Sequence, residues 1–314
     1  MSSESDSLPP GVPPLPPYVV VFGPRANCTL EICPVEISVY GYRPSLAANV
    51  SFIALFTVSA LIHTYLGIRW KQWWYMACMN IGAVNAVIGY AGRVMMWYNP
   101  FNFAAFMMQI ICISTGPVYY CAAIYITLAL SINYFAPDLS RFKPSLFYYI
   151  FITCDIISLI LQAAGGGLST STSGQSQMGV DLALAGLSFQ VFTMLVFCFF
   201  FADYLIRYFR SGRWKNRAHD GSSTRLKLFF SFMVLAILLI LARCAYRLAE
   251  LHEGYRSEGL IRDEGLFIAL EGVMVLASVY CLMVGHPGLV FKAKKDSASG
   301  DPSSEQELQE YPGR

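Results

Sequence analysis

The chain contains little charge for its length. Only 13% of its 314 residues are Asp, Glu, Lys or Arg, whereas 55% are hydrophobic. A soluble domain of this size needs a more charged surface, so the composition favours an integral membrane protein. The net charge of +2 at pH 7 says little about partners, and we expect no nucleic-acid partner.

Motifs that carry enzyme chemistry are also missing. The chain has no GxxxxGK[ST] phosphate loop, so ATP does not drive it directly. Its four histidines are scattered, and only His63 falls within an apolar run, which is too few for a zinc hydrolase site. A Ser-His-Asp arrangement with a specific spacing is absent as well. We therefore expect no enzymatic activity, no metal and no cofactor.

Long apolar runs dominate what is present. Each is about 20 residues or more, long enough to cross ~30 Å of hydrocarbon as a helix, whereas the alternation of barrel strands is absent. The sequence therefore predicts an all-α, seven-transmembrane-helix bundle. The expected spans are 46–67, 73–97, 104–134, 146–166, 181–206, 228–251 and 266–285.

Basic residues concentrate in alternate loops, at 69–71, 141–143, 207–227 and 292–295. Because cytoplasmic loops of membrane proteins carry the excess of Lys and Arg, this pattern places the C-terminus in the cytoplasm. Seven spans then place the N-terminus outside. The basic segment 207–227 also suits anionic membrane lipids, although a role in setting the orientation explains it equally.

The chain divides into three regions by composition: a Ser- and Pro-rich extracellular tail (1–45), the membrane domain (46–288) and a polar, disordered cytoplasmic tail (289–314). No cleavable signal is visible at the start. Asn27 begins an Asn-Cys-Thr glycosylation sequon on the expected outer side. Cys28 and Cys33 lie on the same side, where they can form a disulfide.

One carboxylate lies in the middle of an expected span. Asp155 is ~14 Å into the run 146–166, close to the midplane, where a charge costs ~3 kcal/mol on insertion scales. Ser158, Gln162 and Gly166 fall on the same helical face. This polar stripe either fixes helix packing or takes part in function, for instance by pairing with a cation or a proton.

Six further charged residues fall in the outer halves of three spans. They are three arginines and three glutamates: Arg93, Arg243, Arg247, Glu250, Glu264 and Glu271. One interpretation is an ion-pair network that clamps these spans together. The other is a polar vestibule that holds a charged headgroup, and the two do not exclude each other.

Two sequence features indicate irregular helix geometry. Gly116 and Pro117 lie inside the run 104–134, where proline removes a backbone hydrogen bond and predicts a kink or hinge. The three glycines at 165–167 read as a flexible helix end that opens an outer loop.

The order and spacing of several motifs resemble the fungal lipid-translocating exporter family over about residues 41–290. They include GYRPSLAAN (41–49), GYAGR (89–93), GPVYYCAAIY (116–125), CDIISLILQAAGGG (154–167), GLSFQ (186–190) and HPG (286–288). The resemblance implies a fungal, multi-pass plasma-membrane protein. It also implies export of amphipathic lipids such as sphingoid long-chain bases, or resistance to toxic lipophilic compounds.

A seven-helix receptor or sensor of lipophilic ligands stays open as an alternative. Against a G-protein-coupled receptor, the third span ends in SINYF rather than an acidic-Arg-Tyr triplet, and the last span lacks an Asn-Pro-x-x-Tyr run. The oligomeric state is left open by the sequence.

Overall fold

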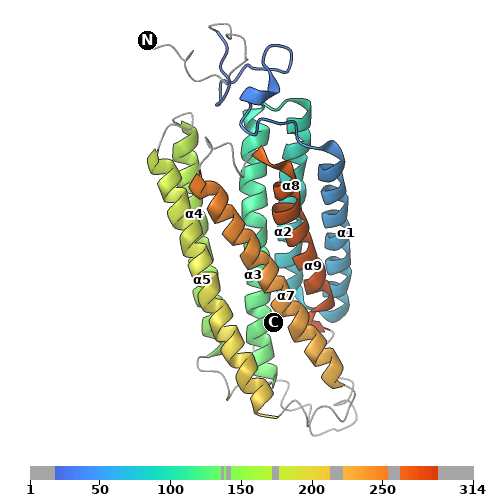
Figure 1. Ribbon diagram of the computed structural model, residues 1–314. Helices are drawn as coiled ribbons and strands as arrows, with labels where there is room; N and C mark the ends of the chain where they lie inside the picture. The colour runs from blue at the N-terminus through green and yellow to red at the C-terminus, as the bar shows by residue number, and fades with distance from the viewer. Residues whose placement is uncertain are drawn as a thin grey trace.

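The computed structural model describes residues 18–135, 138, 143–171, 177–212, 222–253 and 262–288, and the helices among them form one elongated bundle (Figure 1). No strand occurs in these ranges. The tail expected at 289–314 lies outside the described residues. The long helices are α1 (Leu46–Trp70), α2 (Trp73–Tyr98), α3 (Phe103–Phe135), α4 (Pro144–Ser171), α5 (Gln177–Arg210) and α7 (Ser222–Glu253).

The last apolar run forms a single continuous helix with an unusual middle. It begins as α8 (Glu264–Leu266), continues as the π-helical segment η6 (Phe267–Val273) and ends as α9 (Met274–Val284). Asp263 caps its start, because Asp263 Oδ1 accepts the backbone N–H groups of Gly265 and Leu266. A π-helical turn inside an α-helix is rare and is often found at functional sites.

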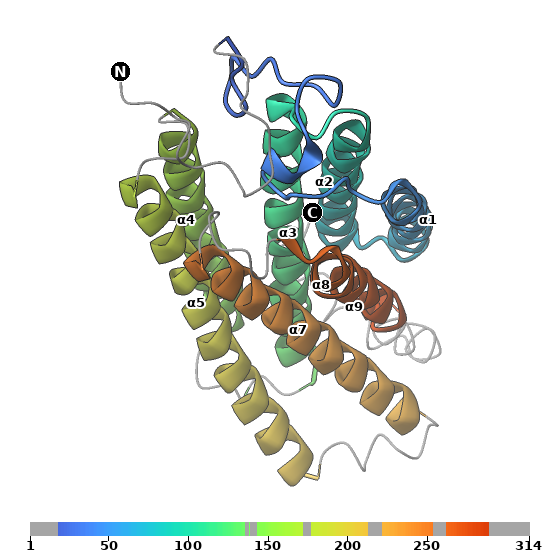
Figure 2. The ribbon, with the colours of Figure 1, turned by 45° about the horizontal axis from the view of Figure 1, so that its top comes forward.

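The helices are arranged with α3 near the centre. The most extensive contacts join α2 to α3 and α4 to α5, and α7 lies against α5, α3 and the last helix. Figures 1 and 2 show α7 running obliquely across α3, with the α4–α5 pair on one side and α1, α2 and α9 on the other.

Small residues on α2 allow its close approach to α3. A Cβ added at Gly82 would lie 2.5 Å from the Tyr120 ring, and one added at Gly89 would lie 2.5 Å from the Ile113 side chain. One added at Gly92 would lie 2.9 Å from the backbone oxygen of Ala105. Small residues at such spacing are how membrane helices bring their backbones together.

The glycines at 165–167 do not end a helix, which corrects the expectation from sequence. Helix α4 runs through them to Ser171. The reason is an interhelical contact: a Cβ at Gly165 would lie 2.5 Å from the backbone N of Ala183 on α5. Gly179 and Gly186 of α5 meet the α4 backbone in the same way. These small residues hold α4 in a long, close seam with α5.

Six of these helical segments are long and apolar enough to cross a membrane: α1, α3, α4, α5, α7 and the helix Glu264–Val284. Many of their large hydrophobic side chains point outward, for example Leu61, Ile160 and Phe199, which are more than half exposed. Such a surface suits contact with lipid. Together the composition and helices define a multi-pass integral membrane protein.

Helix α2 is not one of these six segments, although it has 26 residues. Its sequence includes Asn80, Asn85 and Arg93, which lower its hydropathy. Arg93 is nevertheless 0% exposed, so its charge faces the interior of the bundle.

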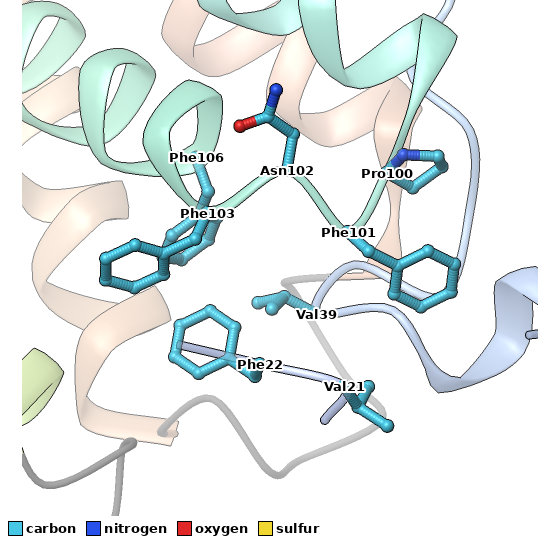
Figure 3. A pocket seen from close by; sticks show the side chains of 8 residues that line it. All are labelled: Val21, Phe22, Val39, Pro100, Phe101, Asn102, Phe103 and Phe106. Carbon is cyan, nitrogen blue, oxygen red and sulfur yellow. The ribbon is translucent and has the colours of Figure 1, made fainter. Parts of the chain in front are cut away.

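The described part of the N-terminal region folds back over one end of the bundle (Figure 1). It contains the short helix η2 (Val35–Ile37) and a disulfide between Cys28 and Cys33. Figure 3 shows Phe22 directed at Phe103 and Phe106 of α3, with ring centroids 5.3 and 5.4 Å apart. We call residues 18–45 the N-terminal cap.

Candidate functional site

The most deeply buried ion pair joins α7 to the π-helical segment. Arg243 Nε lies 2.8 Å from Glu271 Oε2, and both side chains are 1% exposed. Removing two charges from water is costly, so such a pair needs close geometry and further hydrogen bonds to satisfy its remaining polar atoms.

Arg243 makes such a further hydrogen bond to a backbone carbonyl of α3. That carbonyl is free to accept because of Pro117. Proline has no N–H, so the carbonyl oxygen four residues earlier, that of Ile113, lacks its usual helical donor. Arg243 Nη2 lies 3.2 Å from this oxygen and donates to it. Pro117 thus creates an acceptor for the arginine within the continuous helix α3. The hinge expected at Gly116 and Pro117 stays a prediction.

Arg247 extends the charged group toward the end of the bundle that carries the cap. Its Nη1 lies 2.6 Å from Glu250 Oε2, one turn further along α7, and its Nε lies 3.8 Å from Glu271 Oε1. Glu271 is therefore shared between Arg243 and Arg247. The Arg247 side chain is 15% exposed, which makes it the most accessible member of this group.

Arg93 forms the centre of a second polar group. Its Nη1 donates to Gln109 Oε1 of α3 at 3.1 Å and its Nη2 donates to the Tyr42 hydroxyl at 3.2 Å. Glu264 Oε1 lies 3.9 Å from Arg93 Nη2. The guanidinium also stacks 3.7 Å from the Phe267 ring, a cation–π contact.

The N-terminal cap is tied to this second group. Gln109 donates to the Tyr40 hydroxyl, and Glu264 accepts the backbone N–H of Ser45, at the start of α1, at 2.5 Å. Burial raises the pKa of Tyr42, an effect that nearby Arg93 opposes, so its phenol stays protonated at neutral pH.

We refer to the two groups together as the polar network: Arg93, Gln109, Arg243, Arg247, Glu250, Glu264 and Glu271. Phe267 lies between the groups, on Arg93 and beside Arg247. A cavity of about 10 Å³ there is lined by Gln109, Ile110, Ile113, Ser114, Arg247, Phe267 and Glu271. It is about the size of one water molecule, so in this conformation the network is closed to a larger group.

Asp155 lies apart from the polar network. It is 2% exposed, and the Tyr125 hydroxyl of α3 interacts with its carboxyl group. Its buried Oδ2 atom has no hydrogen-bond partner among the described residues. The polar face expected from the sequence is only partly continuous. The Ser158 hydroxyl donates to the backbone oxygen of Asp155, and Gln162 Nε2 donates to Gln190 Oε1 of α5 at 3.0 Å.

Sequence reasoning missed a histidine cluster at the opposite end of the bundle. The His286 ring lies 4.7 Å from that of Trp70, 4.8 Å from that of Tyr75 and 6.5 Å from that of His63. Burial, together with His63, lowers the pKa of His286 to about 3, so it is neutral at physiological pH. The HPG motif was the available signal, because a glycine at 288 lets the chain pack on Trp70.

The described residues contain no group of three His, Cys, Asp or Glu side chains arranged to hold a metal ion. The contacts observed in the polar network are ion pairs and hydrogen bonds. Buried charged groups within membrane-spanning helices are characteristic of proteins that move ions or polar solutes.

Comparison with known proteins agrees with this class of membrane protein. The model of the RTA1-like protein family matches residues 79–294, and the chain belongs to that family. No solved structure matches it.

The chain is similar to several named fungal proteins. It is 31% identical to the sphingoid long-chain base transporter RSB1 of Saccharomyces cerevisiae (strain Lalvin EC1118), over 85% of this chain and 78% of that protein. It is 25% identical to the lipid-translocating exporter-like protein RTA1 of Leptosphaeria maculans, over 81% of this chain and 52% of that protein. It is 24% identical to the probable lipid transporter atnI of Emericella nidulans, over 92% of this chain and 76% of that protein.

Proposed function

We propose that this chain moves amphipathic lipids across a membrane and has no enzymatic activity. The observation that carries the proposal is the buried ion pair of Arg243 and Glu271 inside an apolar bundle. Packing alone would favour apolar side chains at these positions, since replacing a buried ion pair by them is often neutral or stabilising. The names of the relatives support the same function.

The proposed topology has seven membrane-spanning helices, with the N-terminus outside and the C-terminus in the cytoplasm of a plasma-membrane protein. Helix α2 serves as the additional span, since its 26 residues extend ~39 Å. It contacts α1 and α3 along its length, so its polar residues need not face lipid.

The substrate class that suits these residues is a cationic amphiphile, such as a long-chain base. Its ammonium group would pair with Asp155 and with the glutamates of the polar network, while its hydrocarbon chain stays against apolar helix surfaces. Access to the network requires the helices or the N-terminal cap to move, because the cavity beside Arg247 and Glu271 is small.

A vesicle assay tests the function. The purified chain is reconstituted into liposomes, and a fluorescent long-chain amine is added to the outer leaflet. Albumin then extracts whatever has stayed there at each time point. The chain should speed transfer to the inner leaflet well above protein-free vesicles, and more for the amine than for an anionic lipid of equal chain length. Binding without faster transfer would overturn the proposal and indicate a sensor.

A further inference from the structure

The titratable side chains that interact with Asp155 in the described ranges are thiols and a phenol. Tyr125 and Cys121 of α3 and Cys244 of α7 interact electrostatically with it. Cys198 of α5 interacts in the same way with Cys121, and Cys154 is the sequence neighbour of Asp155 on α4. Thiols and a phenol supply no positive charge at neutral pH.

The arginine that precedes Cys244 on α7 already has partners of its own. Arg243 is next to Cys244 in sequence, but its guanidinium pairs with Glu271 and the Ile113 carbonyl. Asp155 has no ion-pair partner within the described ranges. Its Oδ2 atom has no hydrogen-bond donor there either.

A lone buried carboxylate has two ways to avoid the cost of its charge. It binds a proton, or it pairs with a cation brought by another molecule. The two are mutually exclusive, since a protonated carboxyl group has no charge with which to hold an ammonium ion. A buried carboxylate with no ion-pair partner and with one oxygen that lacks a hydrogen-bond donor can therefore act as an exchange site.

We propose that Asp155 binds a proton and the ammonium group of a cationic amphiphile in turn, so that the chain exchanges one proton for one lipid. This inference rests on the proposed lipid transport and names its driving force. In the exchange, the proton converts the carboxylate to a carboxylic acid and releases the ammonium lipid with its charge unchanged. One positive charge moves each way, so the cycle transfers no net charge.

Tyr125 is a positioning residue in this scheme. Its hydroxyl interacts with the Asp155 carboxyl group, whose Oδ2 atom still lacks a donor and can take the proton or face the ammonium group. Replacing it by phenylalanine removes one donor and keeps the ring among Phe151 and Phe197. The Tyr125→Phe variant should still exchange, with a shifted pH dependence of the rate.

The test uses the full chain in liposomes and a long-chain amphiphile with a trimethylammonium head. This probe cannot lose a proton, so a pH gradient does not trap it passively. With a proton gradient and the membrane potential clamped at zero, it should accumulate on the acidic side by the same ratio as the protons. A membrane potential without a pH gradient should produce no accumulation.

Asp155→Asn should lose the response to the pH gradient, and Asp155→Glu should retain it at a lower rate. Elution as a single species with an unchanged melting temperature shows that the Asn variant is folded. If the wild-type chain moves the probe at a rate that ignores the pH gradient, or if Asp155→Asn keeps the response, the exchange proposal is wrong and lipid transport still stands. If the wild-type chain moves no lipid, the proposed function itself fails.

Discussion

Arg243 Nη2 of α7 donates to the carbonyl oxygen of Ile113 on α3, at 3.2 Å. This oxygen is available because residue 117 is a proline. A sequence feature usually taken to bend a helix thus anchors a charged residue of another helix. The same arginine pairs with Glu271 on the π-helical segment, so one guanidinium links three parts of the bundle.

Removing only one partner of the buried ion pair should destabilise the chain strongly. Arg243→Met leaves Glu271 charged and buried with only the more distant Arg247, which costs ~3–5 kcal/mol by analogy with other buried pairs. The double variant Arg243→Met with Glu271→Met should recover most of this loss, because no uncompensated charge remains. Melting temperatures in detergent measure both. A double variant as unstable as the single one would contradict this account.

Pro117→Ala should separate two effects of the proline: it leaves the Ile113 carbonyl free for Arg243, and it destabilises helix α3. Alanine restores an N–H that competes with Arg243 for the Ile113 carbonyl, so lipid transfer should slow several-fold. Stability should stay equal or rise, since proline within a helix costs ~3 kcal/mol relative to alanine. Pro144→Ala is the matched control, because Pro144 is the first residue of α4, where no helical acceptor awaits an N–H. Unchanged transfer in Pro117→Ala would show that the carbonyl contact is not needed.

The close packing of α4 on α5 can be tested by replacing three consecutive glycines of α4 one at a time. Gly165→Ala places a methyl group 2.5 Å from the backbone of Ala183, which should cost ~1–3 kcal/mol. Gly166→Ala and Gly167→Ala meet nothing within 4 Å and should be neutral or stabilising by up to ~1 kcal/mol. Thermal unfolding of the three variants gives the comparison. Equal effects at all three positions would refute the close approach of these helices.

The proposed topology places the N-terminal cap outside the cell, which predicts glycosylation at the sequon that begins at Asn27. This residue is exposed in the N-terminal cap, where its Oδ1 accepts the Val20 backbone N–H at 2.8 Å. Expression in a fungal host should give a band that shifts on glycosidase treatment, and Asn27→Gln should abolish the shift. Thr29→Ala removes the sequon and keeps the Asn27 side chain, so it separates the loss of glycan from the loss of that hydrogen bond. A wild-type band that does not shift would contradict the predicted modification.

Much of the fold could be predicted because a membrane imposes a simple length rule on helices. The expected runs coincide with the observed helices to within six residues at each end, with the largest differences at the start of α7 and the end of α4. Arg247 and Glu250, three residues apart on α7, pair as side chains at this helical spacing can. Arg243 lies one turn before Arg247 on the same helix, but its partner is Glu271 on another helix.

Contacts between helices set the limit of prediction. The helical periodicity of the sequence does not indicate that residues 267–273 are π-helical. It also does not indicate that Tyr125 interacts with Asp155, or that the rings of His63 and His286 lie near each other. The register and tilt of neighbouring helices decide these pairs. For the same reason, glycines at 165–167 looked like a helix end, although Gly165 is a packing contact with α5.

The central claim is that the buried charges serve lipid movement and not only the packing of the bundle. The most direct test measures transfer of a long-chain amine in liposomes by the Arg243→Met, Glu271→Met double variant, compared with the wild-type chain at matched protein content. We expect the double variant to unfold near the wild-type temperature and to transfer the amine at least tenfold more slowly. Transfer at the wild-type rate would show that the ion pair is dispensable for transport and would contradict the account.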